Sequence, residues 1–442
     1  MPPDLLTARD PAEVICHRDG AAITVGGFLA QAAALAERLP DQGQAVNTCT
    51  DRYAALVAFA AALWRGHPTL LGRTGAAGEA PAAGTYILTD AQQPDAHRSG
   101  ASLPVFEVDL APVHRTVVAP AIPADRIAAI AFTSGSTGAP TAHLKPWGAL
   151  VLGAAAAAAR FGLRAQDGPP SSLVATVPPQ HMYGFETTLM LPLHARLAIH
   201  AGASFFPCDV LDALDAVPPR RILITTPLHL RVLLAETRRP PDLAAVISAT
   251  APLSREMAEA VEREWHAPML EIYGATEAGS MASRRSAHEE DWLPYDGIIL
   301  RPGFADTPSL AEIPGLGPVP LSDALEAVGN GRFRLLGRIA DLVKLGGKRA
   351  SLAELNRVLA AVPGVVDGVF LAPRDLERNP AARLAAIVVA PGRTAAEILG
   401  ALRDRLEPAF LPRRLEMVAA LPRDHLGKLP HQALRQMVRE EP

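Results

Sequence analysis

A run of hydroxyl and glycine residues at 133–138 follows a compact apolar segment at 127–133. Backbone amides beside two glycines, together with the hydroxyls, can surround phosphate oxygens, and a helix expected at 147–160 would add the partial positive charge of its N-terminus. The chain has no GxxxxGK[ST] Walker loop and no GxSxG nucleophile elbow. The run therefore predicts a phosphate loop, with a solvated turn as the alternative. Its residues are Thr133, Ser134, Gly135, Ser136, Thr137 and Gly138.

Lysine is scarce in this sequence. Only four of the 42 basic residues are lysines, and the others are arginines. An ammonium is a compact charge with rotatable donors, whereas a guanidinium is a planar fork, so a retained lysine indicates a site that needs an ammonium. Chance is the alternative for any single one. The four are Lys145, Lys344, Lys348 and Lys428.

Six further segments follow the phosphate loop in a recognisable order. They are PPQHMYGFE at 178–186, SATAPLS at 248–254, YGATEAG at 273–279, PLSDAL at 320–325, GRIADLVKLGGKR at 337–349 and LPRDHLGKLP at 421–430. With FTSGSTGAP they resemble the ordered motifs of the adenylate-forming superfamily, which holds acyl-CoA synthetases, firefly luciferase and the adenylation domains of peptide synthetases. The resemblance implies an ATP-dependent, AMP-forming acid–thiol ligase.

In such a ligase a carboxylate attacks the α-phosphate of ATP and pyrophosphate leaves, so cations and amides must offset the gathered negative charge. The resemblance implies that Glu277 holds Mg²⁺, because a hard dication prefers carboxylate oxygen; a solvated surface glutamate is the alternative. It implies that Tyr273 and Gly274 lie against adenine, with core packing as the alternative for Tyr273. Thr276 would contact the α-phosphate region.

The later motifs imply residues for the ribose, the catalytic cation and the thiol. Asp323 and Arg338 match the ribose-binding positions, although Ser322 replaces the glycine of the TGD motif. Lys428 matches the lysine that swings into the site with the small domain and stabilises the transition state, with a surface lysine as the alternative. Gly347 matches the glycine that lets a phosphopantetheine arm pass close to the backbone.

The segment at 178–188 contains no Asp to pair with an α-ammonium, and its only acid is Glu186. An amino-acid substrate is therefore disfavoured, and the aromatic character of MYGF favours an aromatic carboxylic acid such as a hydroxybenzoate. His181 resembles the residue that gates the acyl pocket, with a core or capping histidine as the alternative. The pocket residues that we expect are His181, Met182, Tyr183, Gly184, Phe185, Ala249 and Thr250.

Some positions depart from the family pattern. Thr141 follows Pro140 where the family usually has a lysine, so we expect Lys145 to supply the missing cation, with solvation of the following helix as the alternative. Ala249 and Thr250 replace both glycines of the adenine loop, and Ala340 occupies the hinge position. Together with Thr141, the hinge alanine leaves open an inactive nucleotide- or acyl-binding relative, against which the retained Glu277 and Lys428 argue.

The resemblance implies that the acceptor is a phosphopantetheine thiol, either on a carrier protein or in coenzyme A. PTAHLKPWG, SATAPLS and the compact length resemble the acyl- or aryl-carrier-protein ligases of bacterial aryl polyene and xanthomonadin pigment pathways. From residue 341 onward there are 16 Lys and Arg against 12 Asp and Glu, which favours an acidic carrier protein as partner.

Apolar runs that alternate with helical patterns predict an α/β fold, with a large N-terminal domain of layered α/β subdomains and a small C-terminal α+β domain. The resemblance implies that the small domain is mobile and that the two domains are 1–338 and 341–442. A chain of 442 residues also exceeds the roughly 250–300 that share one core. The expected strands are 85–88, 104–108, 127–133, 173–177, 221–226, 244–249, 269–273, 366–372 and 384–390. The expected helices are 147–160, 228–238, 254–265, 351–362 and 394–406.

Composition narrows the class of protein. Apolar residues make up 49% and charged residues 20%, which is typical of a globular chain. The formal net charge of −4 excludes a general nucleic-acid binder. Three dispersed cysteines, no visible signal peptide and no apolar run of about 20 residues predict a cytoplasmic protein without a membrane span.

Overall fold

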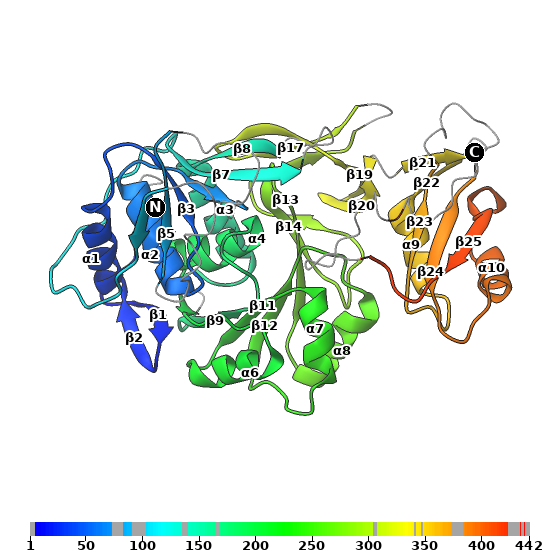
Figure 1. Cartoon of the computed structure of the whole chain (residues 1–442), viewed down its shortest axis with the longest axis horizontal. Coiled ribbons are helices and arrows are strands. Elements are labelled where there is room, and N and C mark those ends of the chain that lie inside the picture. The colour runs from blue at the N-terminus through cyan, green and yellow to red at the C-terminus, as the bar shows by residue number, and fades with distance from the viewer. Residues whose placement is uncertain are drawn as a thin grey trace. The chain divides into compact units, whose positions relative to one another are not determined.

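The computed structural model describes residues 5–72, 83–90, 103–134, 140–164, 168–303, 307–339, 342–345, 348–373, 383–422, 434 and 437. The chain forms two compact units (Figure 1). Unit 1 comprises residues 1–300 and 311–319, and unit 2 comprises residues 301–310 and 320–442. This layered arrangement of helices and sheets confirms the predicted fold class, while the boundary expected between residues 338 and 341 stays a prediction.

A nine-stranded sheet forms the centre of unit 1, in the order β15-β14-β13-β12-β11-β9-β10-β1-β2. From β13 to β1 all neighbouring strands are parallel, and helices connect several of them, as the alternating pattern predicted. The strands are β1 (Val14–Arg18), β2 (Ala21–Thr24), β9 (Ser171–Ala175), β10 (Leu197–His200), β11 (Arg221–Thr225), β12 (Leu243–Ser248), β13 (Met269–Ala275), β14 (Gly279–Arg285) and β15 (Leu293–Pro294). The helices are α6 (Pro207–Ala216), α7 (Pro227–Ala235) and α8 (Arg255–Trp265).

The carboxyl ends of β9, β11, β12 and β13 lie at one edge of this sheet because the four strands are parallel. Open α/β sheets bind ligands at this edge. The segments that leave it include 176–181, 249–254 and the turn at 276–278. Three of the predicted motifs are therefore brought together by strand direction alone.

A six-stranded sheet in the order β6-β5-β3-β4-β7-β8 completes unit 1. Its strands are β3 (Gln44–Asn47), β4 (Thr69–Leu71), β5 (Thr85–Thr89), β6 (Val105–Glu107), β7 (Ile127–Ser134) and β8 (Pro140–Pro146), and its helices are α1 (Val25–Ala36), α2 (Arg52–Trp64) and α3 (Trp147–Arg160). Helix α3 has the predicted bounds, but β8 precedes it and pairs antiparallel with β7. The expected order of strand, loop and helix is therefore wrong. A second strand satisfies the open edge of β7, and α3 does not begin directly after the phosphate loop.

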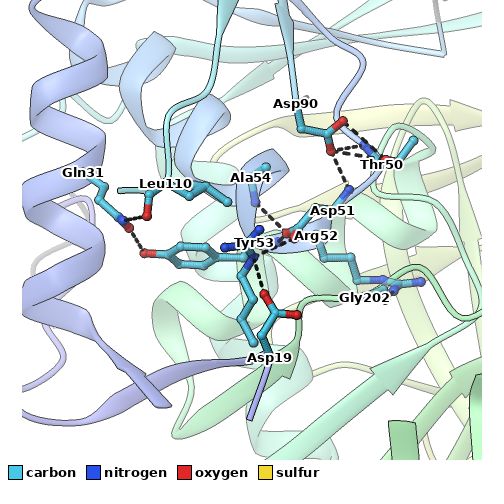
Figure 2. A network of polar contacts seen from close by, with 11 residues as sticks. Asp19, Gln31, Thr50, Asp51, Arg52, Tyr53, Ala54, Asp90, Leu110 and Gly202 are labelled. Carbon is cyan, nitrogen blue, oxygen red and sulfur yellow. Dashed lines mark hydrogen bonds and ion pairs between the residues drawn. The ribbon is translucent and has the colours of Figure 1, made fainter. Parts of the chain in front are cut away.

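A polar network at the start of α2 ties this helix to both sheets (Figure 2). The Asp51 carboxylate caps α2, and the Asp90 carboxylate, after β5, accepts hydrogen bonds from the Thr50 and Asp51 amides at 2.7 Å each. The Arg52 guanidinium is 3% exposed and donates to the carbonyls of Gly202 and Ala175. Because Ala175 ends β9, this buried arginine fixes the start of the segment that leads to His181.

Short helical turns follow that segment: α4 (Met182–Phe185), a π-helical turn (Glu186–Met190) and α5 (Leu191–His194). Among the described residues, none of the helices has the length and hydropathy needed to cross a bilayer.

Unit 2 has its own hydrophobic core, which includes Leu359, Phe370 and Ile398. Its elements confirm the helices and strands expected after residue 350. The elements of this unit are β19 (Asp323–Gly329), β20 (Arg332–Arg338), β21 (Leu342–Leu345), β22 (Lys348–Ser351), α9 (Leu352–Ala360), β23 (Asp367–Leu371), β24 (Ala385–Val389), α10 (Ala395–Arg403), a 3₁₀ turn (Pro408–Phe410) and β25 (Arg414–Met417). A three-stranded sheet, β16 (Ile299–Arg301), β17 (Ser309–Ile313) and β18 (Gly317–Leu321), contains the residues at which the chain divides into the two units.

Candidate active site

The segment that leads to His181 is held by α2 and its surroundings. The Gln180 side-chain amide donates to the carbonyl of Cys49 at 2.6 Å, and the Gln180 backbone carbonyl accepts from the Gly72 amide at 2.9 Å. His181 is exposed at the N-cap of α4, and its side chain forms no capping hydrogen bond. Neither the core nor the capping alternative therefore describes this histidine. At Gly184 a Cβ would lie 2.0 Å from the Pro178 carbonyl oxygen, so only glycine fits this turn.

Two of the expected pocket residues hold α4 in place. Phe185 is fully buried and meets Phe59 edge to face at 5.0 Å. The Tyr183 hydroxyl donates to the carbonyl of Ile247 at 3.0 Å, and burial raises the pKa of Tyr183. These two side chains anchor α4 against α2 and β12, and their place in the pocket wall stays a prediction. Met182 remains partly exposed and lies near Gly279.

The YGATEAG motif forms the end of β13 and a tight turn into β14, with Thr276 and Glu277 half-buried in the turn. At Gly274 a Cβ would lie 2.7 Å from the Gly279 carbonyl oxygen, so this close approach requires glycine. Tyr273 is 7% exposed, and its ring lies 5.7 Å from that of Trp292. Much of the Tyr273 ring therefore packs in the core, and its contact with adenine stays a prediction.

Lys145 of β8 lies beside the Glu277 turn. It is 3% exposed, and its Nζ donates to the Glu277 backbone carbonyl at 2.7 Å. Burial lowers the pKa of Lys145 to about 8, and the carboxylates of Glu186 and Glu277 oppose this shift. A solvating or capping role is excluded, because the lysine is buried and the α3 N-cap has no side-chain hydrogen bond.

Thr133, the first residue of the phosphate-loop motif, is next to this cluster. Its Oγ1 lies 3.0 Å from Nε2 of His143, whose pKa is lowered by burial and raised in part by Glu277. The structure therefore brings a buried lysine and the predicted magnesium ligand together from distant parts of the sequence, and His143, two residues before Lys145 on β8, contacts the first residue of the loop motif. Gly135, Ser136, Thr137 and Gly138 lie outside the described residues, as do Gly347, Ala340 and Lys428.

Glu186 also belongs to this cluster. Its carboxylate accepts hydrogen bonds from the Ser280 amide, at 3.1 and 3.2 Å to its two oxygens, and from the Ser280 hydroxyl. Burial raises the pKa of Glu186, while the Ser280 hydrogen bonds and the Lys145 charge oppose the shift. From the sequence Glu186 was only the lone acid of its segment, and Ser280 gave no signal beyond following YGATEAG.

The residues present fit a magnesium ion. Among the described residues no group of three or more His, Cys, Asp or Glu side chains forms a metal cage. Mg²⁺ is usually held by one or two carboxylates, waters and substrate phosphates, so a single carboxylate beside a phosphate loop suits it. Within the described part of the chain, no hydrogen bond or ion pair engages the Glu277 carboxylate.

The predicted ribose residues are register partners in unit 2. Asp323 begins β19 and Arg338 ends β20, and the two residues lie directly opposite each other in this antiparallel pair. Asp323 is half-buried. Asp323 and Arg338, which are 15 positions apart and belong to two motifs, are thus brought together as expected. Their contact with ribose stays a prediction.

The adenine-loop residues follow β12. Ala249 is 6% exposed, whereas Thr250 is exposed and has φ of 79°. A β-branched residue in this left-handed region is strained, and such strain persists mainly at functional positions. Glycine would adopt this backbone freely.

Thr250→Gly is therefore expected to raise the free energy of unfolding of unit 1 by about 0.5–1 kcal/mol, the relief of strain less the extra chain entropy of glycine. Chemical unfolding followed by tryptophan fluorescence measures this, because all four tryptophans lie in unit 1. Ala249→Gly, at the adjacent position without positive φ, is the matched control and should lower stability. A destabilised Thr250→Gly variant would show that the threonine makes compensating contacts.

Comparison with known proteins identifies the family. The pattern that defines AMP-binding enzymes matches residues 73–302. A 4-coumarate–CoA ligase from Rhodobacter capsulatus is 30% identical over 305 residues, which cover 68% of this chain and 74% of that protein. The chain belongs to the AMP-binding enzyme family. A 4-chlorobenzoate–CoA ligase from a Pseudomonas species is 26% identical over 356 residues, covering 70% of this AMP-binding enzyme and 65% of the relative.

Solved structures agree in fold. ATP-bound MatB from Rhodopseudomonas palustris has a TM-score of 0.81 at 20% identity, with 99% of each chain covered. The O-succinylbenzoate coenzyme A synthetase MenE from Bacillus subtilis, in complex with AMP, has a TM-score of 0.78 at 18% identity, with 98% of this chain and 96% of that chain covered. Family membership confirms the adenylate-forming resemblance, and with it the enzyme class: an ATP-dependent, AMP-forming acid–thiol ligase.

Proposed function

We propose that this AMP-binding enzyme converts an aromatic carboxylic acid, such as a hydroxybenzoate, and ATP into an acyl adenylate and pyrophosphate, and then passes the acyl group to the phosphopantetheine thiol of an acyl carrier protein. The observation that carries the first step is the contact of the buried Lys145 with the Glu277 turn. The names of the 4-coumarate and 4-chlorobenzoate ligases support an aromatic acid.

The residues divide the work of the first step by charge. Thr133 and the rest of its motif hold the β- and γ-phosphates, and Lys145 offsets negative charge next to them. Glu277 would hold Mg²⁺, which would neutralise the departing pyrophosphate. Lys428 contacts the acid and the nucleotide as charge develops at the α-phosphate.

The remaining residues position the two substrates. Tyr273 and Gly274 lie against adenine, Asp323 and Arg338 hold the ribose, and Thr276 contacts the α-phosphate region. His181, exposed at the N-cap of α4, lines the route of the acid and the thiol. In the second step the phosphopantetheine arm passes Gly347.

Exchange of labelled pyrophosphate into ATP, measured over a panel of aryl, fatty and amino acids, tests the substrate class. Aryl acids should support the fastest exchange. Exchange with amino acids alone would refute the proposal. AMP formation with any carboxylate would exclude a catalytically inactive relative.

The pKa of Lys145 predicts a pH dependence for ATP use. Because the pKa in the folded protein is about 8, below the ordinary 10.5, the ammonium charge is present below pH 8 and is lost as the pH rises through that value. The KM for ATP should therefore rise above pH 8, while the KM for the acid changes less. Steady-state kinetics at several pH values measure both constants.

Lys145→Met should raise the KM for ATP roughly 10-fold, the scale of one lost charged hydrogen bond, and should abolish its rise above pH 8. The KM for the acid in the same variant is the internal control. Equal changes in both constants, or none in either, would reject a role for Lys145 at the phosphates.

The finer proposal concerns the acceptor. Arg403, Arg405 and Arg413 are exposed in unit 2, and the excess of positive charge after residue 341 suits an acidic carrier protein. The resemblance to ligases of bacterial pigment pathways supports the same acceptor, a role in pigment biosynthesis and a cytoplasmic location. Coenzyme A is the second candidate, favoured by the names of the relatives.

Both acceptors, offered with the best acid at low and high salt, distinguish these candidates. Transfer to the carrier protein should dominate at low salt and weaken as salt screens the contact. Efficient transfer to free coenzyme A without any acylated carrier would overturn the carrier proposal.

A further inference from the structure

We propose that a small cavity between Glu186 and Tyr295 receives a hydroxyl substituent on the ring of the aromatic acid. This inference rests on the proposed function and narrows its substrate to a hydroxyaryl acid. The cavity lies within unit 1 and has a volume of about 20 Å³. That volume holds about one water molecule or one hydroxyl group, and excludes an aromatic ring.

The walls of the cavity are mostly apolar. Helix α3 contributes Leu150 and Ala154, and Phe161 follows this helix. Met190 and Ile272 also line the cavity. The polar groups that face it are Glu186, Thr187, Ser280 and Tyr295. An apolar site with a few placed polar groups is the usual form of a specificity pocket.

Tyr295 supplies a buried donor without a partner. The residue is 1% exposed, and no described residue hydrogen-bonds to its hydroxyl. Its ring meets Phe161 edge to face at 6.0 Å, so the hydroxyl has a fixed direction. Buried hydroxyls are nearly always hydrogen-bonded, and an orphan at a cavity indicates a missing ligand group or water.

Glu186 supplies an acceptor with capacity to spare. Ser280 donates to its carboxylate from both the amide and the hydroxyl, yet two carboxylate oxygens can accept about four hydrogen bonds. Lys145 lies close enough for its charge to stabilise the carboxylate. Because a cation already balances this carboxylate, a neutral donor suits the cavity better than a second cation.

A hydroxyl group satisfies both residues at once, since it donates to Glu186 and accepts from Tyr295. A ring hydrogen or chlorine does neither. A ring amino group donates but accepts poorly, because its lone pair is delocalised into the ring. The two side chains therefore select for a phenolic hydroxyl.

Tyr295→Phe tests the selection. The kcat/KM for adenylation of the best hydroxybenzoate should fall roughly 10- to 100-fold, because the lost hydrogen bond leaves the substrate hydroxyl incompletely paired. The kcat/KM for benzoate should stay the same or rise. The melting temperature should not fall, since the tyrosine hydroxyl has no partner among the described residues.

Tyr183→Phe is the matched control, because the Tyr183 hydroxyl bonds to backbone carbonyls. It should lower the melting temperature and affect both acids alike. Glu186→Gln should reduce the ratio of kcat/KM between hydroxybenzoate and benzoate, whatever it does to overall activity.

An unchanged ratio in both Tyr295→Phe and Glu186→Gln would overturn the inference while leaving the proposed function intact. A wild-type enzyme that activates fatty or amino acids but no aromatic acid would instead refute the proposed function, and this inference with it.

Discussion

Lys428→Ala is expected to lower the rate of acyl-adenylate formation roughly 10²–10³-fold, the scale observed when one preorganised charge donor is removed from a transition state. The resemblance assigns this lysine to the step in which the carboxylate attacks the α-phosphate and charge develops. A planar guanidinium cannot replace a compact ammonium there, which accounts for a retained lysine in a chain that otherwise uses arginine. The affinity for ATP should change little, because the lysine is expected to reach the nucleotide only when the small domain moves.

Single-turnover adenylation and equilibrium binding of ATP measure the two quantities separately. Arg357→Ala, which removes an exposed cation from α9 in the same unit, is the matched control and should leave both unchanged. Comparable adenylation rates for Lys428→Ala and the parent would remove Lys428 from the mechanism.

Glu277→Gln should lower adenylation roughly 10²-fold and raise the Mg²⁺ concentration needed for half-maximal rate, because a neutral amide is a weaker ligand for a hard cation. The backbone carbonyl that accepts from Lys145 at 2.7 Å is retained in this variant. The turn should therefore keep its shape, and the change should report the carboxylate itself.

Titration of the adenylation rate with Mg²⁺ makes this measurement. Glu259→Gln is the control, since it removes an exposed carboxylate of the same unit that pairs with Arg255 at the surface. If Glu277→Gln required the same Mg²⁺ concentration as the parent, Glu277 would not be the metal ligand.

Several parallel strands of unit 1, such as β11 at 221–225 and β12 at 243–248, could be predicted from sequence because they are short apolar runs. The parallel strands β1, β3, β4 and β10 were not predicted. Strand β8 could not be predicted. Its sequence PTAHLKP mixes polar and apolar residues, and it becomes a strand by pairing with β7. Pairing of this kind is a tertiary effect that a local pattern does not record.

The residues that line the small cavity could not be predicted for a related reason. The helical turn that follows MYGF, Glu186–Met190, is a π-helix with i→i+5 hydrogen bonds, which no local pattern in the sequence marks. Glu186 and Thr187 of this turn line the cavity. Tyr295 reaches the same cavity from a loop after β15, where no sequence motif marks it.

Thr250 and Lys145 show what a motif comparison can and cannot give. Thr250 departs from the family pattern and Lys145 was expected to replace the cation missing at Thr141, but the motifs carry no information on backbone conformation or burial. The positive φ of Thr250 and the contact of Lys145 with the Glu277 turn follow only from the packing around them.

The central claim is that the enzyme makes an aryl adenylate, and direct detection of that intermediate tests it. Enzyme incubated with Mg²⁺, ATP and a hydroxybenzoate, without any thiol acceptor, would be quenched and analysed by mass spectrometry for the adenylate and by a coupled assay for pyrophosphate. The account predicts the aryl adenylate with one pyrophosphate per adenylate, and roughly 10²–10³-fold slower formation of both products with Lys428→Ala. Formation of ADP and inorganic phosphate instead, or an adenylate with aliphatic or amino acids but with none of the aromatic acids, would contradict it.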